Sequence, residues 1–360
     1  MTMKRETQPV EPAPKYLPCP DLWLITTYFN PGNFATKRRN YERFAAPLLD
    51  AGIPLLTVEC ALGDAPFALP AAPHLLQVRG PDVLWLKERL INLAIAGLPP
   101  HVEKIAWLDA DILFANPAWA QQTSALLDRF PVVQPFARVG RLGKDQGTFA
   151  GRARRSFASQ LQRRAESAHL GSAAHGQPGI AWAAQRQLIA QHGLYDAAIV
   201  GGGDELFAHA LGNGINSVCV RGITGVRQWR QPMLVQKLWN HLLRVPWPPL
   251  LAKHYLARQS AAPTVAEHER FFAHYLRWAQ PFALAVQRNL AYTPGLALHL
   301  WHGNPRNRQY ASRNAILQRH HFDPATDLRL NAEGIWAWAS DKPALHQEVN
   351  AYFFSRNEDE

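Results

Sequence analysis

Apolar segments of strand length alternate with amphipathic segments of helix length through the first part of this 360-residue chain. Residues 22–29 form an apolar, β-branched run that stops at an Asn-Pro-Gly turn, which predicts a buried strand entering a loop. Residues 39–50 carry apolar side chains at helical spacing, and residues 53–61 predict a second buried strand. Further strands are predicted at residues 74–79, 104–114 and 131–136, with helices at 82–97 and 116–130. This pattern predicts an α/β, Rossmann-like fold whose helices flank a mostly parallel sheet.

Composition divides the chain into four parts. Residues 1–20 are rich in Pro and charge, lack periodicity and are expected to be a flexible arm. Residues 21–224 hold the α/β domain, with a basic excursion at residues 138–175 in which the strand pattern is lost and a single helix is predicted. Residues 225–292 predict a helical subdomain rich in basic and aromatic side chains. Residues 293–360 start with an apolar run and continue into helices that are expected to pack back on the α/β domain.

Basic residues outnumber acidic ones by 38 to 28, which gives a formal net charge of +10. The excess is concentrated at residues 138–164 and 221–258, and the second segment holds no acidic residue. Such segments attract nucleotide phosphates, acidic polymers or an anionic membrane surface. Because Trp229, Trp239 and Trp247 accompany the second segment, it is expected to seat the chain on anionic lipid or to bind an acidic, lipid-linked glycan. The alternative is an ordinary helical subdomain with a solvated, charged face.

Cysteine spacing and hydropathy bear on the cellular compartment. Cys19, Cys60 and Cys219 lie far apart with no CxxC pairing, which argues against a disulfide framework or a structural zinc site and suits a reducing environment. No apolar run is long enough to span a membrane, and the first residues lack the apolar centre of a signal peptide. The expectation is a cytoplasmic protein, with peripheral contact at the inner face of the membrane if the basic segment binds lipid.

Two carboxylates, Asp109 and Asp111, lie in the middle of a predicted apolar strand. Burying them costs free energy unless something compensates their charge, and a divalent cation is the simplest compensation. If the strand ends near Leu108 and bends, both carboxylates can face a cation that bridges phosphate oxygens. The alternative is that Asp109 caps a neighbouring helix while Asp111 faces water.

An apolar run at residues 296–303 ends in His302 and Gly303. A neutral imidazole at this position can complete a metal site with the two carboxylates. His299 competes for the same role, and a surface or hydrogen-bonded core histidine is the alternative for either.

Three glycines at residues 201–203 precede Asp204 and Glu205, within a stretch predicted to hold a strand and two helices. Glycines let a ligand approach the backbone closely, and they place two carboxylates at the start of a helix. A carboxylate there can act as general base toward a substrate hydroxyl. The alternative is that Asp204 is only the N-cap of that helix.

Cationic side chains near these motifs can neutralise a diphosphate. The candidates are Lys87, Arg89, Arg306, Arg308 and Arg313, each of which a solvated surface position would also explain. Polar side chains at the end of the first strand, Thr26, Thr27 and Asn30, are placed to meet a nucleoside.

Taken in order, these motifs resemble those of glycosyltransferases of the GT-A fold. WLDADILF is similar to their DxD strand, and HGNPRNRQY resembles the late His-Gly metal-ligand segment of several GT-A families. GIAWAAQRQLIAQHGLYDAAIVGGGDELF is similar to the C-terminal block of the β-1,4-galactosyltransferase group. The likeness spans residues 22–320 and is dense at 87–136, 179–207 and 299–313. It departs from the group at Val200, where the group has Trp, and in the Asp-Glu order of the acidic pair.

The resemblance implies a metal-dependent enzyme that moves a sugar from a nucleotide-diphosphate sugar, with UDP favoured, to a hydroxyl of a glycan or lipid-linked acceptor, as in bacterial surface-glycan synthesis. It implies Mn²⁺ or Mg²⁺ bound by Asp109, Asp111 and His302. Asp204 is the expected base because it directly follows the glycine turn, and Glu205 is its rival because alignment on the glycines places it at the base position. If either carboxylate reaches the acceptor hydroxyl, the anomeric configuration of the sugar is expected to be inverted. If neither does, it is expected to be retained.

The resemblance also implies two further sets of binding residues. The donor set is Thr26, Thr27, Asn30, Lys87, Arg89, Asn92, Asp109 and Arg308, and the acceptor set is Trp182, Gly202 and Gly203. Two other functions are the alternatives. A metal-dependent nucleotidyltransferase or phosphoesterase would place more carboxylates around the metal, and a polyanion-binding protein would explain the charge but not the acidic residues in a strand. Nucleic acid is not an expected partner, since the sequence carries no recognised nucleic-acid motif.

Overall fold

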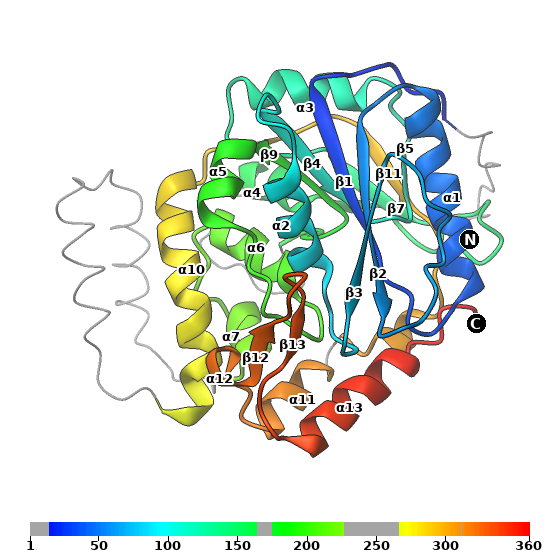
Figure 1. The fold of residues 1–360 in the computed structure, drawn as a ribbon. Coiled ribbons are helices and arrows are strands. Elements are labelled where there is room, and N and C mark those ends of the chain that lie inside the picture. Colours follow the sequence, from blue (N-terminus) through cyan, green and yellow to red (C-terminus); the bar gives the residue numbers. More distant parts are fainter. Residues whose placement is uncertain (1–13, 164–174, 227–265, 311) are drawn as a thin grey trace, which may run out of the picture.

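A seven-stranded sheet forms the centre of the molecule in a computed structural model that describes residues 14–163, 175–226, 266–310 and 312–360 (Figure 1). Its strands are β1 (Leu22–Tyr28), β2 (Leu55–Leu62), β3 (Leu75–Gly80), β4 (Lys104–Leu108), β6 (Val132–Gln134), β9 (Ala181–Gln185) and β10 (Leu290–Tyr292). They lie in the order β10-β6-β9-β4-β1-β2-β3, and β9 runs antiparallel to both of its neighbours. The predicted α/β class with a mostly parallel sheet is confirmed.

Helices cover both faces of this sheet, because its central strands are apolar on both sides. Leu24 and Ile25 are neighbours in β1 and point to opposite faces, yet both are fully buried. One face is covered by α1 (Ala35–Asp50) and α3 (Trp119–Leu127). The other is covered by α2 (Lys87–Gly97), α5 (Arg186–His192), α6 (Gly203–Leu211) and α10 (Arg270–Val286). Two apolar clusters result, one on each face.

The strand predicted over residues 104–114 is two strands with a turn between them. β4 ends at Leu108, and β5 (Ile112–Phe114) leaves the main sheet to pair antiparallel with β11 (Leu296–His299). β11 also pairs with β7 (Arg138–Arg141), and β7 pairs with β8 (Arg154–Arg155), which completes a four-stranded sheet. This second sheet brings the end of β11 to the turn after β4, where the backbone N–H of Leu300 donates to the carbonyl of Asp111 at 2.8 Å.

The C-terminal part of the chain packs back against the cluster that holds α2 and α10 (Figure 1). It comprises η2 (Pro305–Arg308), α11 (Asn314–Arg319), α12 (Pro324–Asp327), the hairpin of β12 (Leu328–Leu330) and β13 (Trp336–Trp338), and α13 (Pro343–Phe354). Leu345 and Val349 anchor α13 in the core. Beyond α13, the carboxylate of Asp359 caps α1 by accepting hydrogen bonds from the backbone N–H groups of Ala35 (3.0 Å) and Thr36 (2.7 Å).

Three segments differ from the sequence-based expectation. Residues 14–20 are anchored to the core and are not a flexible arm, because Tyr16 and Cys19 are buried and the hydroxyl of Tyr16 accepts a hydrogen bond from the backbone N–H of Phe114. The basic excursion contains β7, β8 and α4 (Phe157–Arg163), whose strands are too short to show a period. The hairpin of β12 and β13 lies where only helices were expected, and its strands are three residues each.

The expected helical subdomain at residues 225–292 is described only in part. Residues 227–265, which hold most of the basic, Trp-containing segment, lie outside the described residues. The described part consists of η1 (Glu267–Glu269), α10 and β10. Tyr275 and Phe282 of α10 are fully buried in the cluster that also contains α6, so α10 belongs to the main core.

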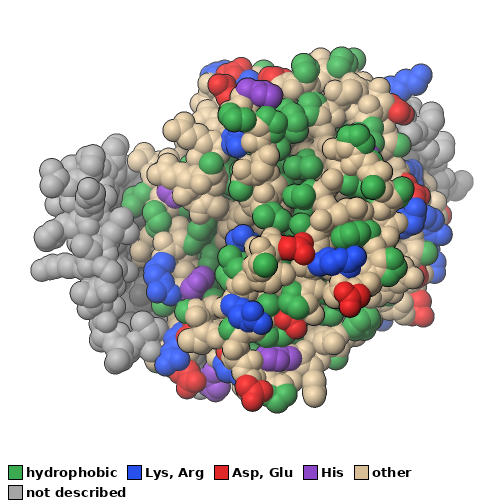
Figure 2. Space-filling model, viewed as in Figure 1, with side chains coloured by type: hydrophobic (Ala, Val, Ile, Leu, Met, Phe, Trp, Pro, Cys, Tyr) green, Lys and Arg blue, Asp and Glu red, His purple; other side chains and the backbone are tan. Residues whose placement is uncertain are grey.

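The face of the molecule in Figure 2 mixes apolar and charged side chains. Charged side chains and histidines gather in its lower half, over the β12–β13 hairpin and the C-terminal helices. Among the helices that the structure describes, none combines the length and the apolar composition needed to cross a membrane.

Candidate functional site

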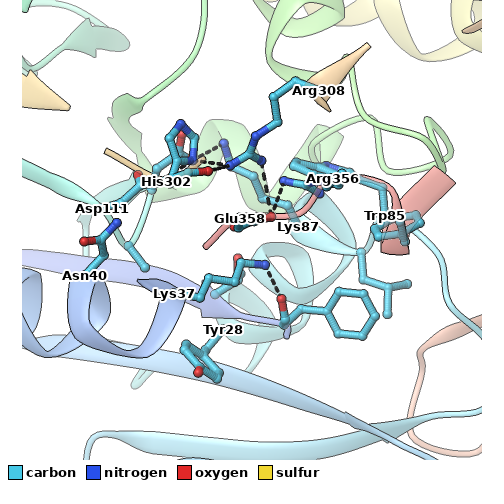
Figure 3. Close-up of a pocket in the computed structure, with 16 residues that line it drawn as sticks. Tyr28, Lys37, Asn40, Trp85, Lys87, Asp111, His302, Arg308, Arg356 and Glu358 are labelled. Atoms are coloured by element: carbon cyan, nitrogen blue, oxygen red, sulfur yellow. Dashed lines mark hydrogen bonds and ion pairs between the residues drawn. The ribbon is translucent and has the colours of Figure 1, made fainter. Parts of the chain in front are cut away.

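A pocket of about 130 Å³ lies at the carboxyl ends of β1 and β4 (Figure 3). Its residues are Thr27, Tyr28, Phe29, Lys37, Asn40, Trp85, Leu86, Lys87, Asp109, Ala110, Asp111, His302, Arg308, Phe353, Arg356 and Glu358. They come from the ends of two central strands, the start of α1, the N-terminus of α2, the segment after β11 and the C-terminal tail. Ligands of open α/β sheets bind at this edge, outside the carboxyl ends of the strands.

Lys87 connects the turn after β4 to the start of α6. Its Nζ lies 2.5 Å from Oδ1 of Asp109 and 2.9 Å from Oδ2 of Asp204. Burial alone would lower the pKa of Lys87, but Asp109 and Asp204 raise it above its ordinary value, so the ammonium stays charged. Burial raises the pKa of Asp109, and Lys87 partly offsets this effect. The structure thus joins three of the predicted site residues in one ion-pair cluster.

Asp111 lies between two imidazoles. Its Oδ1 is 3.4 Å from Nε2 of His299, and its Oδ2 is 3.1 Å from Nδ1 of His302. The three residues offer ligand atoms that all lie within 4.8 Å of one another. Oδ1 of Asp111 and Nε2 of His299 are buried and have no hydrogen-bond partner among the described residues. Two ligands of one ion, each about 2.1 Å from it, lie roughly 3 to 3.5 Å apart, so these orphaned atoms fit a shared cation.

The predicted metal ligands were Asp109, Asp111 and His302. The structure places Asp111 and His302 together and adds His299, the competing histidine, whereas Asp109 is bound by Lys87. Burial and the neighbouring Arg308 lower the pKa of His302, which keeps its imidazole neutral and able to bind a metal ion. Two imidazoles and one carboxylate fit Mn²⁺ better than Mg²⁺, because Mg²⁺ prefers oxygen ligands.

A buried network of charges closes the pocket on the side of the C-terminal tail. Nη2 of Arg308 contacts Nδ1 of His302 and donates to its carbonyl oxygen at 2.8 Å. Oε1 of Glu358 lies 3.4 Å from Arg308 and 2.9 Å from Arg356. The guanidinium of Arg356 in turn lies 5.0 Å from the centre of the Trp85 ring. Both arginines are held in fixed positions at the pocket wall (Figure 3).

A further cation, Lys37, lies on the opposite wall, where its ammonium donates to the carbonyl of Phe29 (Figure 3). With Lys87, Arg308 and Arg356 it gives the pocket four cationic side chains. The N-terminus of α2, whose helix dipole favours anions, also opens into the pocket. Because carboxylates already pair with the other three cations, Lys37 is the one most available to an anionic group such as a phosphate.

Sequence reasoning missed ten pocket residues: Tyr28, Phe29, Lys37, Asn40, Trp85, Leu86, Ala110, Phe353, Arg356 and Glu358. Lys37 is the third residue of α1, which starts four residues before the helix predicted over 39–50, and helix starts at this edge of a sheet often face the ligand. Arg356 and Glu358 follow the last helix, and nothing in the sequence links them to the strand ends.

Thr26 and Trp182, which were expected to contact ligands, are fully buried. The hydroxyl of Thr26 donates to the carbonyl of Leu108 at 2.8 Å, so it joins β1 to β4 and does not face the pocket. The indole N–H of Trp182 donates to the carbonyl of Pro178 at 2.7 Å. Both residues therefore hold the fold together and are removed from the binding sets.

Three other predicted donor residues also make structural contacts. Asn30 hydrogen-bonds the backbone of Phe34 and so shapes the loop after β1. Arg89 and Asn92, both on α2, bind the carboxylate of Asp196 at 3.3 Å and 3.1 Å. None of the three lines the pocket. Thr27, Lys87, Asp109 and Arg308 are the predicted donor residues that do.

The glycine turn before α6 is filled by protein side chains. A Cβ on Gly203 would lie 2.3 Å from Oε1 of Glu88, and one on Gly202 would lie 3.3 Å from Ile223. Gly202 also has a φ of 102°, which favours glycine. The turn thus lets α6 approach α2 and α7 (Val218–Thr224) closely, and the expected acceptor contacts at Gly202 and Gly203 are replaced by these packing contacts.

The two carboxylates after the turn point to different partners. Asp204 binds Lys87 and so belongs to the pocket cluster. Oε1 of Glu205 lies 3.5 Å from Nε2 of His175, in a separate group of side chains. The geometry therefore separates the two candidate bases, and Asp204 is the one connected to Asp109.

Glu88 lies beneath this cluster, 5% exposed, with Oε2 accepting a hydrogen bond from the indole N–H of Trp85 at 3.0 Å. Its Oε1 is buried with no hydrogen-bond partner among the described residues. Burial and the charge of Asp204 raise the pKa of Glu88 to about 8. The folded protein therefore favours the protonated acid, and the side chain destabilises the fold increasingly as the pH rises from the ordinary range of a glutamate toward 8.

Replacing Glu88 with Gln keeps the shape of the protonated acid and removes the titration. We expect Glu88→Gln to raise the free energy of unfolding at about pH 8.5 by roughly 1–3 kcal/mol, with no gain at about pH 4.5. Urea unfolding at both pH values measures this difference. Glu103→Gln, at an exposed position, is the matched control and should show no such pH dependence. An equal effect of Glu88→Gln at both pH values would contradict the assignment.

Comparison with known protein families and with curated proteins finds no match to this sequence. The functional proposal therefore rests on the geometry of the site. Its defining features are a metal-ligand cluster after the central strand β4, a pocket lined by four cations and an ion-paired carboxylate at the start of α6.

Proposed function

We propose that this chain is a metal-dependent glycosyltransferase of the GT-A type, which moves a sugar from a nucleotide-diphosphate sugar, with UDP favoured, to a hydroxyl of a glycan or lipid-linked acceptor. The observation that carries the proposal is the cluster of Asp111, His299 and His302 beside a cation-lined pocket at the carboxyl edge of the sheet. The strand order β3-β2-β1-β4 supports it, because doubly wound sheets that bind nucleotides place their first four strands in this order.

The pocket residues divide into groups that match the parts of such a donor. Lys37, Arg308 and the N-terminus of α2 would bind the diphosphate oxygens, and Phe29 and Trp85 offer apolar surface to the nucleoside. Asp111, His299 and His302 would hold Mn²⁺, which when bound neutralises charge on the diphosphate. Together these groups stabilise the departing nucleoside diphosphate.

Asp204 is the proposed general base. It would accept the proton of the acceptor hydroxyl, whose oxygen attacks the anomeric carbon as the bond to the diphosphate breaks. Lys87 orients Asp204 and ties it to Asp109. Attack from the face opposite the leaving group inverts the anomeric configuration. The alternative is a retaining reaction. If Asp204 stays paired with Lys87 and does not reach the acceptor hydroxyl, the acceptor attacks from the same face as the leaving group. The anomeric configuration of the product distinguishes the two.

The contacts around the cluster bear on the rival functions. A nucleotidyltransferase or phosphoesterase is expected to gather several carboxylates at the metal, whereas Asp111 is the only carboxylate in the described metal-ligand group that it forms with two histidines. A polyanion-binding protein needs exposed cations, whereas Arg308 is 6% exposed and aimed into a pocket. A cytoplasmic location, and contact of the basic segment with the membrane, are part of the same proposal.

Removing the central metal ligand should remove donor binding. We expect Mn²⁺ plus a UDP-sugar to raise the melting temperature of the wild-type chain, and Asp111→Ala to abolish the rise, because a shared cation would link ligand and protein. Thermal-shift measurements with UDP-, GDP- and CMP-sugars, each with and without Mn²⁺, identify which nucleotide the donor carries. Asp50→Asn, at an exposed position, is the control. Stabilisation by none of these donors would overturn the proposed donor site.

Lys37 should contribute to the affinity for the donor. We expect Lys37→Met to weaken nucleoside-diphosphate binding by about tenfold, equivalent to roughly 1.4 kcal/mol, because one charged contact to phosphate is lost. Isothermal titration calorimetry with Mn²⁺ present measures the change. Arg38→Met is the matched control, since Arg38 is the next residue but pairs with Glu42 at the surface. Equal losses in the two variants would exclude a specific role for Lys37.

Loss of the base should separate turnover from binding. We expect Asp204→Asn to lower kcat by about 100-fold or more while donor affinity stays within a few-fold of wild type, because the amide cannot accept the proton. Initial rates with the donor identified by thermal shift give kcat, and calorimetry gives affinity. If Asp204→Asn keeps full turnover and Glu205→Gln loses it, the base is Glu205.

A further inference from the structure

A second group of potential metal ligands lies around α6, separate from the pocket. It consists of His175, Glu205, His209 and Cys219, whose ligand atoms all lie within 4.8 Å of one another. Glu205 and His209 are four residues apart on α6 and therefore share one face of the helix. Cys219 comes from α7, and His175 precedes β9. Three separate parts of the chain thus converge on one point.

The segment that carries His175 is held by backbone hydrogen bonds. The N–H of Gln177 donates to the carbonyl of Arg155 at 2.8 Å, and the N–H of Phe157 donates to the carbonyl of Gln177 at 2.9 Å. Gly176 has a φ of 81°, and a Cβ there would lie 2.7 Å from the carbonyl oxygen of Ser156. The close approach that only glycine permits places His175 against α6.

The contacts within the group are those of ligands around a common centre. Nε2 of His175 lies 3.5 Å from Oε1 of Glu205, and Cys219 hydrogen-bonds Glu205. The rings of His175 and His209 are nearly perpendicular, at 80°, with centroids 5.2 Å apart. Phe157 packs against both imidazoles and gives the group an apolar wall.

His209 supplies the independent observation that points to a ligand. It is fully buried, and neither of its ring nitrogens has a hydrogen-bond partner among the described residues. Buried polar atoms are almost always paired, so an imidazole with two orphaned nitrogens calls for a missing partner.

We propose that His175, Glu205, His209 and Cys219 form a closed, structural Zn²⁺ site. Two imidazole nitrogens, one thiolate sulfur and one carboxylate oxygen are the ligand types that Zn²⁺ takes in a tetrahedral structural site. The ion would join α6, α7 and the segment before β9 at one point. It would also hold Glu205 apart from the ion pair of Asp204 and Lys87. The inference is independent of sugar transfer.

Cobalt substitution tests the site through its sulfur ligand. The full-length protein is stripped with a chelator and titrated with Co²⁺, which gives a near-ultraviolet charge-transfer band when a thiolate binds it. We expect this band in the wild-type chain, its loss in Cys219→Ser, and its displacement by one equivalent of Zn²⁺. Asp111→Ala and Cys60→Ser are the controls and should keep the band, because the pocket cluster contains no sulfur and Cys60 lies in β2.

A second measurement covers the case in which Cys219→Ser does not fold. Native mass spectrometry of Asp111→Ala should show one bound Zn²⁺, and His209→Gln in the same background should lose it. The proposal is overturned if stripped wild-type protein gives no thiolate band, or if Cys219→Ser keeps it. These readouts involve no donor and no turnover, so they distinguish failure of the zinc site from failure of the proposed function.

Discussion

The candidate site depends on the two ion pairs that Lys87 makes. Its ammonium lies between Asp109, at the end of the central strand, and Asp204, at the start of α6, two carboxylates nearly a hundred positions apart in the chain. In this half-buried setting, with Glu88 beside them, the carboxylates would repel one another without the cation. Lys87 is placed there because α2 starts where the loop after β3 returns to the sheet edge. One side chain thus sets the relative position of a strand end and two helices.

The second constraint is the break between β4 and β5. A continuous strand would alternate its side chains and send Asp109 and Asp111 to the same face, buried among apolar residues. The turn instead directs Asp109 to Lys87 and Asp111 to the two histidines. Because β5 pairs with β11, the same turn determines where His299 and His302 arrive. The cluster of Asp111, His299 and His302 is therefore a consequence of strand pairing between distant parts of the chain.

The sequence predicted those features that depend on residues close together in the chain. The alternation of apolar runs gave the central strands and the helices between them, and charge in an apolar strand marked Asp109 and Asp111. It could not distinguish a polar side chain that faces a pocket from one that bonds within the fold, which is why Thr26 and Asn92, placed in the donor set, lie outside the pocket. The glycines before α6 predict a close approach of a ligand to the backbone, whereas in the structure the side chains of Glu88 and Ile223 occupy that space. Arg356 and Glu358 reach the pocket only through the packing of α13, which no local pattern encodes.

The capping of α1 by Asp359 has a consequence for synthesis on the ribosome. The pocket wall begins at Thr27 and is completed by Glu358, and Asp359 pins that last segment to the backbone of Ala35 and Thr36. Contacts between residues so far apart in the sequence form late, because the intervening chain must first emerge from the ribosome and fold. A nascent chain would therefore carry its main sheet before it has a finished pocket. The cations that line the cavity would remain open to solvent until Glu358 and Asp359 have emerged and packed against α1.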